Sequence, residues 1–190
     1  MASHGVKISQ QGVDIKNANL KDVQKAETND GKRFLPHLLY AMALPYFFGA
    51  RTQILRYQTA ASTLKQQPVT SVQTCLHEVS CLFEDLATVS KYAEMCGHTH
   101  ELHSLWLDVR NHIRHDVREE LDNESDKRKN ERAKRLGLNE KLQTSISFTP
   151  EAITVGGTQI AITTVNDYLS WAENVIGGVL KEAQEKGWIK

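Results

Sequence analysis

Residues 102–121 read LHSLWLDVRNHIRHDVREEL, and this stretch decides which fold the sequence predicts. Its apolar residues recur at intervals of three and four, at Leu102, Leu105, Trp106, Val109, Ile113, Val117 and Leu121. Residues spaced in this way lie on one side of an α-helix, which has about 3.6 residues per turn. We therefore predict a helix from about Thr99 to Leu121 whose apolar side packs on a protein core.

Two more helices precede this one in the sequence. Apolar residues recur at helical spacing from Phe34 to Lys65, and Pro45 is expected to kink or break that run. Thr70 or Ser71 is expected to cap the next helix, because hydroxyl side chains accept hydrogen bonds from the unpaired backbone N–H groups there. That helix is expected to end at Gly97, since glycine suits a C-terminal cap.

Short strands are expected at both ends of the chain. Residues 5–15 alternate apolar and polar positions on either side of a Gln-Gln-Gly turn, which predicts a hairpin. Near the C-terminus, Gly156-Gly157 is a good two-residue hairpin turn. The strands expected around it are 145–149, 152–155 and 159–163. A last amphipathic helix is expected over residues 165–186.

These patterns predict an α+β protein that is mainly α. We expect a helical bundle with a short N-terminal hairpin and a C-terminal β-hairpin plus helix. Residues 1–33 would form the first hairpin and a linker, 34–141 the helical core, and 142–190 a C-terminal unit that packs on this core. A length of 190 residues fits one domain with a small appendage.

The charge balance and the cysteines limit the classes of function. Lys plus Arg and Asp plus Glu both number 23, so the formal net charge is zero. This excludes a strongly basic protein that coats nucleic acid, although it leaves room for a local basic patch. Three cysteines without disulfide spacing, and an N-terminus without a signal-peptide core, predict a cytoplasmic protein. The apolar stretch 34–50 is too short and too interrupted by prolines for a membrane span, so no membrane contact is expected.

Three polar residues on the helix of residues 99–121 suit phosphate chemistry. Asn111 and His115 are four residues apart, so they share one polar face of a regular α-helix. Arg110 lies about 140° from His115 around the helix axis, but its long side chain can reach a ligand that both residues hold. A guanidinium binds phosphate through two hydrogen bonds, and an imidazole transfers protons near neutral pH. RNA carries its own nucleophile, the 2′-hydroxyl, so these groups can cleave it without a metal.

The run Arg110-Asn111-His112-Ile113-Arg114-His115 resembles the signature of HEPN ribonucleases. That signature is an Arg, a polar residue that is often Asn, three to five further residues and then a His, on a late helix of a small helical bundle. The resemblance covers roughly residues 34–125 and implies a metal-independent endoribonuclease that forms a homodimer, with two motifs in one cleft. It implies Arg110, Asn111 and His115 as the catalytic set. Many family members act in toxin–antitoxin or antiviral systems, which implies a protein inhibitor or regulator as a further partner.

Cations near the motif would contact the RNA backbone if the chain binds RNA. The candidates are Arg114, Lys127, Arg128 and Lys129. The alternative for residues 122–141 is a solvated helical extension or a loose linker. The motif has an alternative of the same kind, a charged outer face on a non-catalytic scaffold protein that self-associates.

A carboxylate on the preceding helix is a candidate for orienting Arg110 or His115. The acids that lie there are Glu78, Glu84 and Asp85, and the alternative for each is a solvated position.

A metal site competes with the phosphate interpretation. The histidines close to Cys96 in the sequence are His98, His100, His103, His112 and His115. Their spacing matches no standard zinc pattern, so we expect no metal and no cofactor. We expect all three cysteines, Cys75, Cys81 and Cys96, to be small buried hydrophobic residues.

Overall fold

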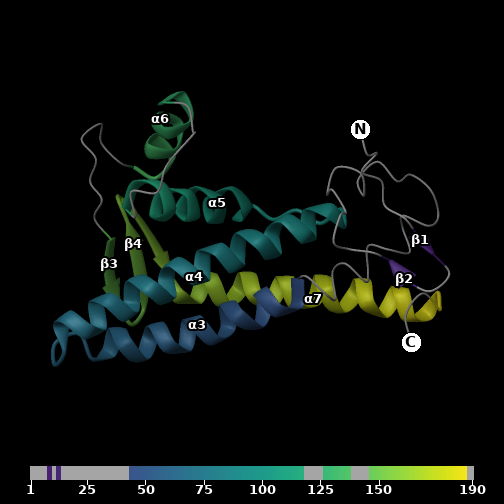
Figure 1. Cartoon of the computed structure of the whole chain (residues 1–190), viewed down its shortest axis with the longest axis horizontal. Coiled ribbons are helices and arrows are strands. Elements are labelled where there is room, and N and C mark those ends of the chain that lie inside the picture. Colours follow the sequence, from purple (N-terminus) through teal and green to yellow (C-terminus); the bar gives the residue numbers. More distant parts are fainter. Residues whose placement is uncertain (1–7, 10–11, 14–42, 118–125, 138–145, 188–190) are drawn as a thin grey trace.

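The structure of the protein is a computed structural model that describes residues 8–9, 12–13, 43–117, 126–137 and 146–187. Side chains are described for residues 43–114, 131–137 and 146–187. The predicted fold class is confirmed, because the described chain is mainly helical and adds short antiparallel strands (Figure 1). Predictions that fall on residues 14–42, 118–125 and 138–145 lie outside the described residues.

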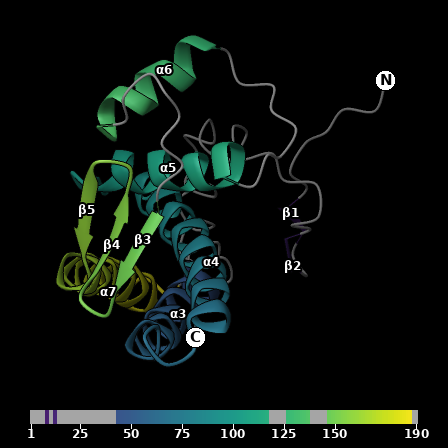
Figure 2. The same ribbon diagram turned by 90° about the vertical axis from the view of Figure 1, so that its left-hand side faces the viewer.

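Three long helices lie side by side and form the body of the protein. α3 (Leu44–Ser62) and α4 (Pro68–Met95) are joined by a short turn, and α7 (Ile162–Glu185) packs on both. Figure 1 shows these helices along the long axis of the molecule, and Figure 2 views them from one end. No helix among the described residues is long and apolar enough to cross a membrane.

Two prolines occupy the first turns of helices. Pro45 is the second residue of α3, which continues from there to Ser62, and the run before it lies outside the described residues. Pro68 is the first residue of α4, so the prediction that this helix opens at Thr70 or Ser71 is wrong. Proline suits this position because its missing N–H would have no acceptor within the helix. The end of α4 is as predicted, with Gly97 following it at a φ of 85°.

The helix that carries the motif is shorter and less regular than predicted. α5 (His103–Asn111) starts at His103 rather than Thr99, and the chain continues as a π-helix, η3 (His112–Val117). A π-helix closes its turns with hydrogen bonds between residues five apart, so each turn holds more residues than an α turn. The predicted apolar side is buried at Trp106, Val109 and Ile113.

The C-terminal strands form one antiparallel sheet in the order β3 (Ile146–Thr149), β4 (Ala152–Val155) and β5 (Thr158–Ala161). The predicted Gly156-Gly157 turn joins β4 to β5, and Gly156 adopts a φ of 60° that glycine tolerates best. Tyr57 of α3 anchors the sheet, since its hydroxyl lies 2.7 Å from the carbonyl oxygen of Thr149 and 2.8 Å from that of Ala152.

The predicted N-terminal hairpin is present as two very short strands. β1 (Ile8–Ser9) and β2 (Gly12–Val13) pair antiparallel, with Ile8 opposite Val13. The linker that was predicted to follow lies outside the described residues.

The basic segment is partly built into the fold. α6 (Asp126–Arg135) lies near α5 in Figures 1 and 2, and Arg135 binds the carboxylate of Asp108 through Nε at 2.6 Å and Nη2 at 2.7 Å. Arg132 is 2 % exposed, and Leu136 is fully buried. The alternative of a loose linker is therefore wrong for this end of the segment. A solvated helical extension describes it in part, because Glu131, Lys134 and Arg135 of the helix are exposed.

Candidate functional site

Arg110 and Asn111 are the last two residues of α5, directly before η3. The Arg110 side chain is largely buried, with 27 % of its surface exposed. Its Nε and Nη2 both donate to Oδ1 of Asn111, at 3.1 and 2.8 Å. In this structure Asn111 therefore orients the guanidinium.

The π-helix changes the relation between Arg110 and His115. In a regular α-helix these positions would lie about 140° apart around the axis. Because η3 starts at His112 and its turns hold more residues, the angle between the two backbone positions is smaller than predicted. Single π turns in proteins occur frequently at functional sites.

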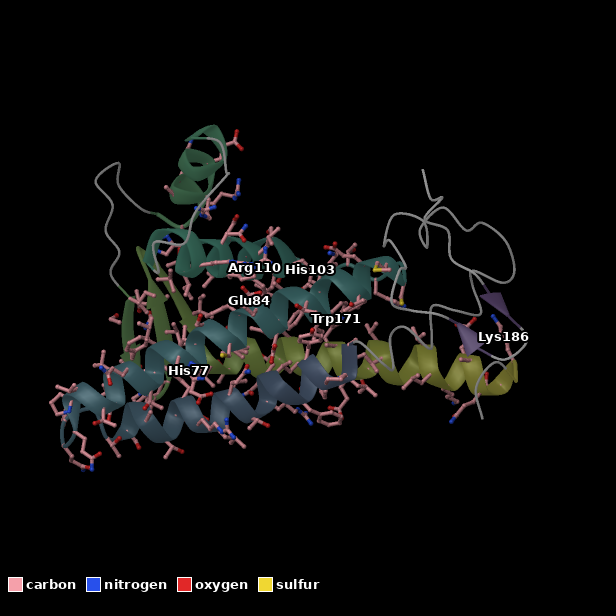
Figure 3. The ribbon with its side chains drawn as sticks, in the orientation of Figure 1. His77, Glu84, His103, Arg110, Trp171 and Lys186 are labelled. Atoms are coloured by element: carbon pink, nitrogen blue, oxygen red, sulfur yellow. The ribbon has the colours of Figure 1, made fainter. Side chains whose placement is uncertain are left out.

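One carboxylate lies between the two arginines of the motif. Oε2 of Glu84 is 4.0 Å from Nε of Arg110, and its Oε1 is 3.9 Å from Nη1 of Arg114. Figure 3 shows Glu84 of α4 next to Arg110 of α5. Both distances are long for ion pairs and the groups are partly exposed, so each contact contributes about 1 kcal/mol or less. Of the three candidate carboxylates on α4, Glu84 is the one in ion-pair range of Arg110.

A hollow of about 230 Å³ opens beside this cluster. Its lining comprises Glu84, the two arginines, Gln53 of α3, and Ser80, Cys81 and Asp85 of α4. The volume lies below the roughly 300–1,000 Å³ of sites for drug-sized ligands, and it suits a group of the size of one phosphate.

Asp85 also lines this hollow, and burial perturbs its ionisation. Its Oδ2 accepts a hydrogen bond from Nε2 of Gln53 at 3.0 Å, and a Cβ on Gly49 would lie 2.3 Å from the same oxygen. Burial raises the pKa of Asp85 from 3.8 to about 6, although the Gln53 hydrogen bond lowers it, and the charge of Glu84 raises it further. Asp85 thus changes its charge in a mildly acidic range, within the same hollow as Arg110.

The structure brings together only part of the predicted site. It places Arg110 and Arg114 around Glu84, and Asn111 against Arg110. The backbone of His115 lies in η3, but its side chain lies outside the described ones. Lys127, Arg128 and Lys129 belong to α6, and their side chains also lie outside the described ones. His112 is buried, with 1 % of its surface exposed. The spacing of the motif assigns the catalytic histidine to position 115 rather than 112.

Two further histidines near the motif, His100 and His103, pack against aromatic side chains, whereas His98 is exposed. His103 is 7 % exposed, and its Nδ1 lies 2.8 Å from Oε1 of Glu94. Nδ1 of His100 accepts a hydrogen bond from the backbone at the start of α5, as a cap. Both rings pack against Tyr168 and Trp171, and Figure 3 labels His103 and Trp171. Within the described part of the chain, no group of three or more His, Cys, Asp or Glu residues could hold a metal ion.

Sequence reasoning missed the residues that complete the hollow. Cys75 is buried as predicted, but the prediction is wrong for Cys81 and Cys96, which are only partly buried. Cys81 lines the hollow, and its Sγ lies 3.9 Å from Nε2 of His77. The four-residue steps from His77 to Cys81 to Asp85 were a usable signal, because they place these residues on one side of α4. Gln53 offered no such signal, since it lies on another helix.

Comparisons with protein-family models, curated proteins and solved structures found no match. The resemblance to HEPN ribonucleases therefore rests on the six residues of the motif.

The arrangement suits the capture of one anionic group. Arg110 and Arg114 both bring positive charge to the hollow, and a phosphate that displaced Glu84 would meet both. Because Asn111 already orients the Arg110 guanidinium, little side-chain freedom would be lost on binding.

Proposed function

We propose that this protein is a metal-independent endoribonuclease that cleaves RNA by attack of the 2′-hydroxyl on the adjacent phosphate. The observation that carries the proposal is the π-helix directly after Asn111, because it reduces the angle between positions 110 and 115. The oriented Arg110 guanidinium at the edge of a phosphate-sized hollow supports it as well. So does the resemblance of the motif to the HEPN signature.

In this mechanism Arg110 binds the scissile phosphate and neutralises the charge that develops on it. Asn111 holds the guanidinium in position. His115 takes the proton from the 2′-hydroxyl or gives one to the leaving 5′-oxygen. The bond from O2′ to phosphorus forms while the bond from phosphorus to O5′ breaks, so the products are a 2′,3′-cyclic phosphate and a 5′-hydroxyl. The flanking backbone would be bound by Arg114, Lys127, Arg128 and Lys129.

The setting of this activity follows the family that the motif resembles. The active form would be a cytoplasmic homodimer in which two motifs line one cleft. A role in a toxin–antitoxin or antiviral system, with a protein inhibitor or regulator, belongs to the same proposal. Neither a metal nor a cofactor takes part in the reaction.

The test is cleavage of a fluorophore-labelled RNA in EDTA by the wild type, Arg110→Ala and His115→Ala. We expect cleavage with a 2′,3′-cyclic phosphate product, and a loss of at least about a hundredfold in each variant. His98→Ala is the matched control, because His98 is exposed on the loop between α4 and α5. Folding of each variant is checked by circular dichroism. A well-folded wild type that cleaves none of several RNAs would contradict the proposal.

A non-catalytic protein that self-associates is the second candidate function. It is favoured by large apolar side chains exposed on α3 and α4, where Phe48, Leu55 and Val69 are 58, 67 and 72 % exposed. Apolar surface of this kind often marks a protein contact when it is contiguous. A stable dimer in light scattering, without cleavage of any RNA, would favour this function.

A further inference from the structure

A second and larger hollow lies where α3 meets α4. Its volume is about 460 Å³, which falls within the roughly 300–1,000 Å³ of ordinary ligand sites. α3 contributes Leu55, Arg56 and Thr59 to its lining, and α4 contributes Thr70, Thr74 and Glu78.

Glu78 is the acidic residue that lines this hollow. It is 7 % exposed, and no hydrogen bond or ion pair joins it to any residue that the structure describes. The hydroxyls of Thr59 and Thr74, by contrast, donate to carbonyl oxygens of their own helices. Because the carboxylate oxygens of Glu78 have no partner in the described structure, an N–H donor on a ligand in the hollow can bind them.

The hollow also presents a cation and an apolar surface. Arg56 is exposed at the hollow and makes no ion pair with a described residue. Leu55 and Ala60 supply apolar contacts. A ligand that fits these features has an amino group for Glu78, a negative group for Arg56 and a flat apolar body between them. A nucleotide has all three.

The two hollows follow one another along the same pair of helices. On α3, Arg56 of the larger hollow is about one turn after Gln53 of the smaller one. On α4, Glu78 is about one turn before Cys81. Glu78 and Asp85 of the smaller hollow are seven residues apart, so they lie on one side of α4 and roughly 10 Å apart along its axis, a distance that a neighbouring nucleotide of the same strand can cover.

We infer that the larger hollow binds the base of a nucleotide next to the scissile phosphate, with the exocyclic amino group of that base donating to Glu78. This inference rests on the proposed function, in which the smaller hollow holds the scissile phosphate. Adenine, cytosine and guanine carry such an amino group and uracil does not. The hollow therefore discriminates against uracil at this position, while Arg56 contacts the adjoining phosphate.

The test measures binding rather than cleavage. Fluorescein-labelled 2′-O-methyl hexanucleotides of A, C or U lack the attacking hydroxyl, and their affinities are measured by fluorescence anisotropy in EDTA. We expect the A and C oligonucleotides to bind the wild type on the order of tenfold more tightly than the U oligonucleotide. Glu78→Gln should largely remove this difference, and Glu101→Gln, the same change at an exposed site, should leave it intact.

A second variant guards against an indirect effect of Glu78→Gln. Thr74→Leu fills the hollow without changing its charge, and leucine is a better helix former than threonine, so the fold should persist. We expect it to weaken binding of all three oligonucleotides. A wild type without base preference, or a preference that Glu78→Gln leaves unchanged, would overturn the inference.

The two proposals fail in different ways. Cleavage of RNA without any effect of Glu78→Gln on base preference would overturn the base site and leave the ribonuclease standing. A base preference that depends on Glu78, in a protein that cleaves no RNA, would retain the base site and overturn the catalytic role. Absence of oligonucleotide binding would overturn the base site, whatever the cleavage assay shows.

Discussion

The Arg110 guanidinium directs two donors, Nε and Nη2, at the single Oδ1 atom of Asn111. Adjacent residues on a helix do not face one another, so helix geometry alone does not produce this contact. It forms because Arg110 folds back toward the following residue at the point where α5 gives way to η3. One edge of the guanidinium is thereby fixed before any ligand arrives.

Asn111→Ala should lower the cleavage rate mainly through kcat, by about tenfold, because the guanidinium loses its orientation and binding changes less. Asn111→Asp is the matched variant. It keeps an acceptor for Arg110 but adds a negative charge, so we expect KM to rise more than kcat falls. Steady-state kinetics on a labelled RNA separates the two parameters. Equal kinetics for Asn111→Ala and the wild type would show that the contact has no positioning role.

Glu84→Gln should strengthen the binding of a 2′-O-methyl oligonucleotide by about two- to fivefold at low salt, since it removes a charge that competes for Arg110 and Arg114. The gain should shrink as salt is added, because these groups are partly exposed and screened. Anisotropy titrations at several salt concentrations measure both effects, with Glu101→Gln as control. Weaker binding by Glu84→Gln would instead mean that Glu84 holds the arginines in their binding positions.

Asp85 should make the stability of the protein depend on pH. Its pKa is about 6 in the folded protein against 3.8 without burial, so the folded state holds the proton more tightly. The stabilising contribution is complete below pH 3.8 and is lost as the pH rises through about 6. Asp85→Asn should therefore be more stable than the wild type above pH 6 and similar to it near pH 4, as measured by urea unfolding. A constant difference across this range would contradict the assignment.

The Asp85→Asn variant has a partner available for its new amide. Oε1 of Gln53 is buried without a hydrogen-bond partner in the described structure, and a rotation of the Gln53 amide would turn this oxygen toward the NH₂ group introduced at position 85. The loss of the carboxylate should thus leave no unpaired donor in the hollow.

Gly49→Ala should destabilise the protein, because the new Cβ would lie 2.3 Å from Oδ2 of Asp85. In the Asp85→Ala background the same change should be stabilising by about 1 kcal/mol, as expected for glycine to alanine within a helix. Urea unfolding of the two single variants and the double variant measures this reversal of sign. Destabilisation of similar size in both backgrounds would mean that the two residues do not touch.

Local patterns in the sequence were enough for the existence of α3, α4, α5 and α7, for the strands and for the turn between β4 and β5. The three- and four-residue spacing of Trp106, Val109 and Ile113 predicted a helix with a buried side, and all three are buried. Gly156-Gly157 predicted the hairpin because a tight turn needs positive φ, which glycine tolerates. These features depend on neighbours along the chain, so periodicity and residue type reveal them. The ends of the helices were less well predicted, as Pro68 shows.

The candidate site depends on contacts that the sequence does not contain. Residue types and spacing singled out Arg110, Asn111 and His115, and they placed acids on α4 without distinguishing among them. Only the packing of α5 on α4 decided that Glu84 meets the two arginines, and only the packing of α3 on α4 decided that Asp85 is partly buried. The switch from α- to π-helix at His112 is likewise absent from the periodicity, because it alters backbone hydrogen bonds without altering residue types. Apolar spacing along one helix determines which side is buried, whereas the partner that buries it is chosen by the whole fold.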